Sequence, residues 1–409
     1  MTRRVTRQAF LRMAGAAAAA AIAPTPSWAQ AADDDLVQRV SLLIQEYDRQ
    51  GNHRTGSRGD VASGQWLITE MRRWGVRGTL ERFALARVEP VPSFIQFRSR
   101  RVEGVPLFDG AFTGADGAYG RLGLPGEATD FVLVRSDDPR YAELRRTGRH
   151  AGVVVITAGA REGLTLLDAP AFASPFGPPV LQVGSDQAAF LEAQAREKPD
   201  VRLVADATRQ EGEALNVVAR VPGRDPRLPP AVFATGRSAW YQGASERGGA
   251  LVCWIEVLRA LAAGRPVRDC LFVATSGDEL GQAGLKAFLA ARADVARGAR
   301  GWLVFGANLG AAQTDDNLLA ASADDLDALV TEALAGGGVT VDARIPRGEV
   351  PTGAAAVLRE AGAPYVSIGG RGNPLERTAA DRWPRAVDVS AVARYARAFV
   401  AVARQRAGA

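Results

Sequence analysis

Histidine and cysteine, the side chains that most often bind zinc or act as catalytic nucleophiles, are scarce in this sequence. The 409 residues include two histidines, His53 and His150, and two cysteines, Cys253 and Cys270. Zinc sites commonly need several imidazole or thiolate ligands, so a site of that kind cannot be built here. We expect His53 to pack within its loop and His150 to lie at the surface. For the two cysteines, a disulfide and a pair of buried free thiols both remain open.

Serine hydrolysis and nucleotide binding both lack their usual motifs. Ser238 follows a predicted strand in the segment Gly236-Arg237-Ser238, but Trp240 stands where a Gly-x-Ser-x-Gly elbow has its last glycine. Neither histidine lies near a position where a triad base is expected. We find no Gly-x-x-x-x-Gly-Lys-Ser/Thr loop for phosphate binding. The sequence therefore points away from both of these functions.

The charge of the chain does not indicate a nucleic-acid-binding surface. The formal net charge is +5, but the first 29 residues contain four arginines and no acid, which leaves about +1 on the remainder. Apolar residues make up 47% and charged residues 23%, a balance typical of soluble globular proteins. At roughly 150 residues per domain, the length predicts two or three domains. We therefore expect no nucleic-acid partner.

The first 29 residues have the pattern of an export signal. Arginines are followed by the apolar run from Met13 to Ala23 and by the small-x-small sequence Ser27-Trp28-Ala29. The apolar run is shorter than the roughly 20 residues that span a bilayer. The segment from Thr6 to Arg12 resembles a twin-arginine signal in which Gln8 replaces the second arginine. We expect a bacterial protein, periplasmic or secreted, with no membrane span.

Apolar spacing divides the mature chain into helical and strand-like segments. Residues 36–50 and 61–74 have the periodicity of helices that bury one face. Between residues 89 and 212, short strand-like segments are separated by Gly, Pro and Asp turns, which predicts a small β-rich insertion. The predicted strands there are residues 93–97, 130–134, 152–156 and 180–183. Beyond it, apolar strands, one of them over residues 338–343, alternate with amphipathic helices, which predicts an α/β fold with a mixed, mostly parallel sheet covered on both faces. The predicted divisions are an export signal (1–29), a first part of the main domain (32–88), the insertion (89–212) and the rest of the main domain (213–409).

Five short motifs stand in a fixed order along the chain. They are Gly56-Ser57 before a helix, Asn216–Gly223, Gly243–Gly249, Ser276–Gly281, and Arg377–Asp381 with Val387-Asp388. In this order they resemble the co-catalytic zinc exopeptidases, which include bacterial leucyl aminopeptidases, glutamate carboxypeptidase II and the transferrin receptor. The segment Pro178–Val183 resembles the end of the protease-associated domain that interrupts this fold in several members. The resemblance implies a three-layer α/β/α sandwich, two zinc ions, and hydrolysis of an N-terminal peptide bond with a glutamate as general base.

The histidine ligands of that family have no counterpart in this chain. The first ligand motif, His-x-Asp, corresponds to Thr235-Gly236-Arg237, and the last histidine corresponds to Arg377. Threonine is a poor zinc ligand, and a guanidinium cannot be one because it stays protonated and has no acceptor. Neither His53 nor His150 falls in a motif. The resemblance therefore implies that both imidazole ligands are missing.

The acidic positions of the family are kept only in part. The bridging aspartate corresponds to Glu246, and the general base with its adjacent ligand corresponds to Asp278 and Glu279. Asp278 is one methylene shorter than the family's glutamate, and a further aspartate ligand falls near Ala307 or Asn308. We therefore expect no metal cofactor, although the family uses zinc. The degenerate ligand positions are Thr235, Glu246, Glu279 and Arg377.

Arginines at or beside the ligand positions suggest a different source of positive charge. Buried carboxylates without a cation are costly, and guanidinium groups match carboxylates with two parallel hydrogen bonds. We expect a cluster in which Arg237, Arg247 and Arg377 pair with Glu246, Asp278 and Glu279.

Two functions follow from this pattern. The first is a binding or scaffold protein that has lost both metal ions and hydrolysis, with a pocket for a peptide or a small carboxylate-bearing ligand. The alternative is an active exopeptidase whose metal is held by the oxygen ligands of Glu246, Asp278, Glu279 and Asp381. Such a site suits magnesium, calcium or manganese better than zinc.

Overall fold

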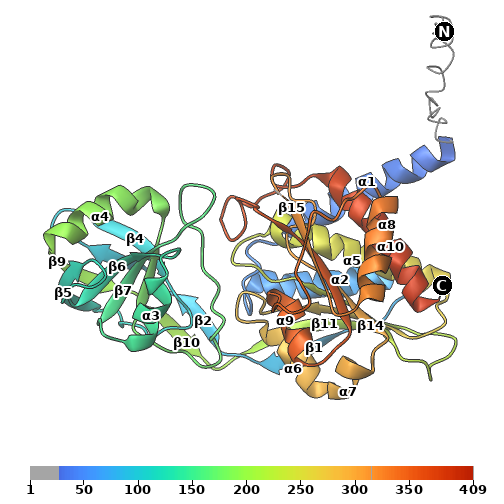
Figure 1. The fold of residues 1–409 in the computed structure, drawn as a ribbon, viewed down its shortest axis with the longest axis horizontal. Helices are drawn as coiled ribbons and strands as arrows, with labels where there is room; N and C mark the ends of the chain where they lie inside the picture. Colours follow the sequence, from blue (N-terminus) through green and yellow to red (C-terminus); the bar gives the residue numbers. More distant parts are fainter. Residues whose placement is uncertain (1–26, 315, 409) are drawn as a thin grey trace, which may run out of the picture.

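The computed structural model describes residues 27–314 and 316–408. The predicted export signal therefore lies, up to residue 26, outside the described residues. Figure 1 shows two bodies, an α/β sandwich and a smaller β-rich body. The first and last parts of the described chain build the sandwich, and the middle of the chain builds the smaller body.

A central sheet of eight strands forms the middle layer of the sandwich. The strands are β1 (Gly78–Ala84), β11 (Glu213–Val221), β12 (Ala231–Gly236), β13 (Cys270–Thr275), β14 (Gly301–Phe305), β15 (Asp316–Ala321), β16 (Ala343–Arg344) and β17 (Tyr365–Arg371). Their order is β1-β11-β13-β12-β14-β17-β15-β16. The pairs β12/β13, β12/β14, β14/β17 and β15/β16 are parallel, and the others are antiparallel. The predicted mixed, mostly parallel sheet is confirmed.

Helices cover both faces of this sheet. Successive residues of a strand point to opposite faces, and in β12 Ala231 and Phe233 join one apolar core whereas Val232 and Ala234 join another. The first core is covered by α1 (Ser27–Asp48), α2 (Arg58–Arg73), α5 (Gly249–Gly264), α8 (Asp324–Gly336) and α10 (Val389–Ala407). The second is covered by α6 (Ala283–Ala291), α7 (Ala293–Gly298) and α9 (Gly353–Glu360). The three-layer sandwich is therefore confirmed.

The smaller body is a closed barrel inserted between β1 and β11. Its strands, in spatial order, are β3 (Ser93–Gln96), β4 (Arg101–Pro106), β8 (Val180–Val183), β7 (Gly152–Ile156), β6 (Phe131–Arg135), β5 (Ala118–Gly123) and β9 (Asp200–Val204). Two helices accompany it, α3 (Arg140–Thr147) and α4 (Ala188–Glu197), and a two-stranded ribbon of β2 (Arg87–Pro90) and β10 (Ala207–Gln210) leads to the sandwich. This is the predicted β-rich insertion, while its boundaries at residues 89 and 212 stay a prediction.

Two further expectations concern cysteines and membranes. Cys253 on α5 and Cys270 on β13 are both buried and free, so of the two open alternatives the structure has the pair of thiols. Within the described part of the chain, every helix is too short or too polar to cross a bilayer.

Candidate functional site

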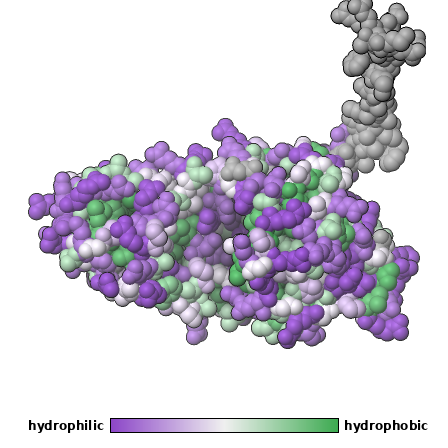
Figure 2. Space-filling model, viewed as in Figure 1, coloured by the Kyte–Doolittle hydropathy of each residue, from purple (hydrophilic) through white to green (hydrophobic). Residues whose placement is uncertain are grey.

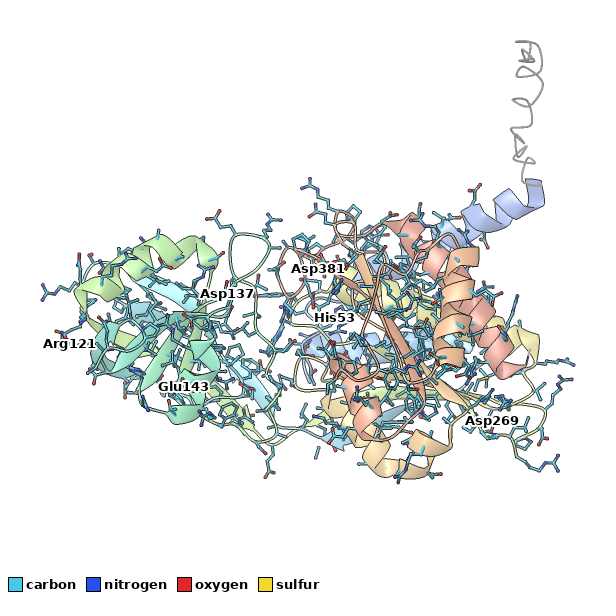
Figure 3. All side chains as sticks on the ribbon, in the orientation of Figure 1. His53, Arg121, Asp137, Glu143, Asp269 and Asp381 are labelled. Atoms are coloured by element: carbon cyan, nitrogen blue, oxygen red, sulfur yellow. The ribbon has the colours of Figure 1, made fainter. Side chains whose placement is uncertain are left out.

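The predicted site residues follow the carboxyl ends of neighbouring parallel strands. β12 lies between β13 and β14 and runs parallel to both, so the loops after these strands meet at one edge, where α/β sheets usually bind ligands. Figure 3 shows Asp381 and His53 on the side of the sandwich that faces the barrel, and Asp269, just before β13, at the opposite end. The surface between barrel and sandwich is hydrophilic on the face in Figure 2.

Arg247 lies between two buried carboxylates at the centre of this edge. Its Nη1 is 2.9 Å from Oδ2 of Asp278, and its Nη2 is 3.3 Å from Oε1 of Glu246. Burial alone would lower the pKa of Arg247, but the two carboxylates outweigh it and raise that pKa. Burial raises the pKa of Glu246 to about 8, against the opposing effect of Arg247. One guanidinium therefore bridges two of the predicted acidic positions.

A turn of π-helix, η2 (Ala244–Gly248), places Glu246 and Arg247 at the site. The carboxylate of Asp381 holds this turn, because it accepts hydrogen bonds from the backbone and hydroxyl of Ser245, both at 2.7 Å, and from the backbone of Glu246 at 2.9 Å. Burial raises the pKa of Asp381 to about 6, although these hydrogen bonds favour its charged form. Asp381 is thus occupied in positioning η2.

The absence of a side chain at Gly236 makes room for Asp278. A Cβ atom at Gly236 would lie 2.0 Å from Oδ2 of Asp278, far inside contact distance. Burial raises the pKa of Asp278, and Arg247 opposes this rise. The central residue of Thr235-Gly236-Arg237 is therefore what lets Asp278 reach Arg247.

Three hydrogen-bond donors hold the carboxylate of Glu279, and no arginine is among them. Its Oε1 accepts from the backbone and the hydroxyl of Thr55, at 2.8 and 2.7 Å, and its Oε2 accepts from Ser238 Oγ at 2.7 Å. Ser238 Oγ in turn accepts from the backbone of Gly277 at 2.9 Å. The expected guanidinium partner of Glu279 is thus replaced by neutral donors from two separate loops.

Arg237 pairs with an acid that the sequence prediction left out. Its Nη1 donates to Oδ1 of Asp60 at 2.7 Å and to Ser63 Oγ at 2.6 Å, and both charged side chains are fully buried. The expectation that Arg237 pairs with Glu246, Asp278 or Glu279 is wrong, because the side chain turns toward α2. Asp60 lies in the first turn of α2, three residues after the N-cap Ser57, where acids commonly cap a helix. Its sequence position therefore gave no sign of a role at the site.

Arg377 contributes its backbone, and its side chain points elsewhere. Its N–H donates to Oε2 of Glu246 at 3.0 Å. Its guanidinium lies 3.6 Å from Asp168, on a loop of the barrel, and 3.9 Å from Glu376. The expected ion pair of Arg377 with the three acids is therefore also wrong. The same barrel loop donates from the backbone of Ala169 to the carbonyl of Glu279 at 2.8 Å, so the insertion helps to build the site.

Thr235 and Asn308 serve as supports. Thr235 is buried and donates its hydroxyl to the carbonyl of Phe305, at 3.1 Å. Asn308 donates its backbone N–H to the carbonyl of Glu246 at 2.9 Å and its side chain to Glu376 at 3.0 Å. Asn308 has a φ of 63°, in the left-handed region that asparagine tolerates better than most residues.

Both histidines lie outside this set of residues. His53 is fully buried, stacks on Tyr47 with ring centroids 3.8 Å apart, and bonds the carbonyl of Gln242 at 2.7 Å. Burial lowers its pKa to about 4. His150 was expected at the surface but is buried in the barrel, where it bonds the carbonyl of Thr129 at 2.8 Å.

A cavity of about 430 Å³ opens beside the cluster. Its charged lining residues are Arg247 and Arg371 with Asp168, Asp278 and Glu376, and its apolar side includes Ile345 and Pro351. Among the described residues, no group of three or more His, Cys, Asp or Glu side chains has an arrangement that could hold a metal ion. The carboxylates that could serve as metal ligands are already bonded to Arg247, to hydroxyl groups and to backbone N–H groups.

Sequence comparisons give little information on the family. No family model matches the chain. A curated relative, tRNA-specific 2-thiouridylase MnmA from Parvibaculum lavamentivorans, is 32% identical over 112 residues. That match spans 26% of this chain and 28% of the relative's own length.

Solved structures resemble the chain over nearly its whole length. A zinc aminopeptidase from Bacillus subtilis matches with a TM-score of 0.71 and 15% identity, over 91% of this chain and 94% of that one. A peptidase M28 precursor from Shewanella amazonensis matches with a TM-score of 0.71 and 16% identity, over 93% of this chain and 97% of that one. An aminopeptidase from Aneurinibacillus matches with a TM-score of 0.69 and 13% identity, over 92% of this chain and 94% of that one. The chain therefore has the fold of the zinc aminopeptidases.

Proposed function

We propose that this protein keeps the aminopeptidase fold without the metal pair or peptide hydrolysis, and that it acts as an exported binding or scaffold protein. The observation that carries the proposal is the position of Arg247, 2.9 Å from Asp278 and 3.3 Å from Glu246. Both acids stand at positions that the family resemblance assigns to metal chemistry. In this proposal the guanidinium of Arg247, which is part of the chain and cannot dissociate, takes the place of the exchangeable metal ions.

A guanidinium at this point opposes the binding of a metal ion. At an effective dielectric constant of about 20, a dication about 4 Å from a guanidinium is repelled by about 8 kcal/mol. Arg247 also occupies one carboxylate oxygen on each neighbouring acid. No imidazole is available to compensate, because both histidines pack elsewhere among the described residues.

The alternative, an oxygen-rich metal site, would need carboxylates that have other partners. Glu279 accepts from Thr55 and Ser238, and Asp381 accepts from Ser245 and Glu246. Glu279 Oε1 and Asp381 Oδ1 each already accept two hydrogen bonds, so only the second oxygen of each carboxylate keeps a lone pair for a metal ion. No contact among the described residues favours this alternative, so it stands as an outcome of the tests below.

The cavity beside Arg247 is the part of the site that supports ligand binding. Its volume of about 430 Å³ suits a small ligand. Its lining combines two arginines, Arg247 and Arg371, with the acids Asp168, Asp278 and Glu376, so it suits a ligand that carries both a carboxylate and an ammonium group, as a peptide does. We propose a peptide or a small carboxylate-bearing molecule as the ligand. The signal-like residues 1–29 support a periplasmic or secreted location.

Hydrolysis of aminoacyl-nitroanilides, measured with and without a chelator, tests this proposal. We expect no turnover above that of a boiled sample, and no increase when zinc, manganese or magnesium is added. The variant Glu279→Gln is the matched control, because it keeps the shape of the side chain and removes a carboxylate of the family's metal site. Turnover that the chelator and Glu279→Gln both abolish would establish the active exopeptidase instead.

A further inference from the structure

A second cavity lies at the end of the sandwich away from the barrel. Its volume is about 350 Å³, and three arginines and one acid line it together with Leu329 and Gln405. The charged lining residues are Arg268 before β13, Arg300 before β14, Arg406 near the end of α10, and Asp325 in the first turn of α8. Asp269, the neighbour of Arg268, marks this end in Figure 3. The cavity therefore lies at the amino ends of β13 and β14, and the site described above lies at their carboxyl ends.

Backbone carbonyls, which carry no net charge, hold two of these arginines. Arg268 Nη1 donates to the carbonyl of Pro229 at 2.8 Å, and Arg406 Nη2 donates to the carbonyl of Arg300. A Cβ atom at Gly301 would lie 2.7 Å from Nη2 of Arg406, so this glycine leaves room for the guanidinium. The Nε of Arg268 is buried and has no hydrogen-bond partner among the described residues. The arginines are thus held in place without being neutralised.

Acids near the cavity have other partners. Asp269 is 2.6 Å from Arg220, and Asp327 is 3.1 Å from Arg344. Asp324 pairs with Arg347. Among the described residues, Asp325 is the one acid in the lining, and three arginines against it leave two positive charges without a counter-charge there.

The positive charges around the cavity also affect the pKa of Arg406. Burial lowers the pKa of Arg406, and the positive charges of Arg300 and Arg268 lower it further, while Asp325 opposes the shift. An anion in the cavity would relieve this repulsion.

We propose that the cavity binds a doubly charged oxyanion, a phosphate group, either free or at the end of a small phosphate ester. Two unneutralised guanidinium charges match a dianion, and the planar forks of arginine match phosphate oxygens. The volume of about 350 Å³ exceeds that of one phosphate and leaves space beside Leu329 and Gln405 for an organic group. This site is independent of the function proposed for the first cavity.

Calorimetric titration with sodium phosphate at constant ionic strength tests the proposal. We expect Arg300→Gln and Arg406→Gln each to weaken phosphate binding about tenfold or more, the usual effect of losing a hydrogen bond to a charged group. Asp325→Asn removes the one lining acid from an exposed position and is expected to strengthen binding severalfold. Arg121→Gln, at the far end of the barrel in Figure 3, is the charge-matched control and should leave binding unchanged.

Three comparisons decide among the outcomes. Acetate should bind more weakly than phosphate, and glycerol phosphate that binds more tightly than phosphate would identify an ester as the ligand. The proposal is wrong if millimolar phosphate gives no binding heat with the wild-type protein, or if Arg300→Gln and Arg406→Gln bind phosphate as the wild type does. Asp325→Asn keeps the proposal falsifiable should an arginine variant not fold, since unchanged or weaker binding there also contradicts it.

Discussion

Replacing Arg247 by glutamine removes the cation that bridges Asp278 and Glu246. The three side chains are 13%, 7% and 4% exposed, in that order. Removing one partner from a buried ion pair typically costs about 3 to 5 kcal/mol, because the remaining charge is left without compensation. We therefore expect Arg247→Gln to lower the free energy of unfolding by about that amount at pH 7. Adding Asp278→Asn to this variant should recover part of the loss, because fewer buried charges then lack a partner.

The unfolding free energy that Arg247→Gln loses should also depend on pH. Burial raises the pKa of Glu246 and of Asp278 although Arg247 opposes both shifts. Without Arg247 both pKa values therefore rise further, and the folded variant holds protons that the folded wild type has released. The deficit of Arg247→Gln should therefore shrink as the pH falls from 7 toward 5.

Urea-induced unfolding followed by circular dichroism measures these differences. Arg377→Gln is the matched control, since its guanidinium is 30% exposed and its acidic neighbours are 3.6 and 3.9 Å away, and such pairs contribute less than about 1 kcal/mol. The reasoning fails if Arg247→Gln is as mild as Arg377→Gln, or if the effects of Arg247→Gln and Asp278→Asn simply add.

Three further predictions concern neighbouring residues. Burial lowers the pKa of His53 from 6.5 to about 4, so between these pH values the unfolded chain binds a proton there that the folded protein does not. The free energy of unfolding should therefore fall by up to about 3 kcal/mol as the pH drops from 6.5 to 4. His53→Phe should flatten the profile of unfolding free energy against pH. Gly236→Ala should cost about 1 to 3 kcal/mol in the same urea assay, because its methyl would overlap Asp278. Arg237→Met should cost about 3 to 5 kcal/mol by leaving Asp60 without a buried partner, and Asp60→Asn in addition should recover part of it; a mild single variant would contradict this.

The regular part of the fold was predictable because its signals are local. Apolar strands such as Ala231–Gly236 alternate with helices that bury one face, and that pattern alone indicates a covered, mostly parallel sheet. In the insertion, the predicted strands at residues 93–97, 130–134, 152–156 and 180–183 correspond to β3, β6, β7 and β8 within one residue at each end. Short apolar runs bounded by turn residues carry this information without any tertiary context.

Two strands of the central sheet were missed for a physical reason. β1 has no buried residue and no clear alternation of apolar residues, so only its antiparallel pairing with β11 makes it a strand. β15 has the sequence Asp-Asn-Leu-Leu-Ala-Ala, rich in residues that also suit a helix, and its pairing with β17 decides its structure. The strand predicted over residues 338–343 is reduced to Ala343–Arg344, beside β15.

The candidate site was less predictable because its contacts join distant segments. Motif order placed Glu246, Arg247 and Asp278 near one another. The partner of Arg237, however, lies 177 residues earlier in the chain, and nothing in the local sequence links the two. The barrel loop that reaches Arg377 through Asp168 is equally remote. Residue types indicated that guanidinium and carboxylate groups must balance, but only the fold decides which pairs form.

The zinc content of the purified protein tests the central claim most directly. The protein would be exposed to excess zinc, passed through a desalting column, and measured by plasma mass spectrometry. With Arg247 held between Asp278 and Glu246, we expect far less than one zinc ion per chain. One or two tightly held zinc ions per chain would contradict the account.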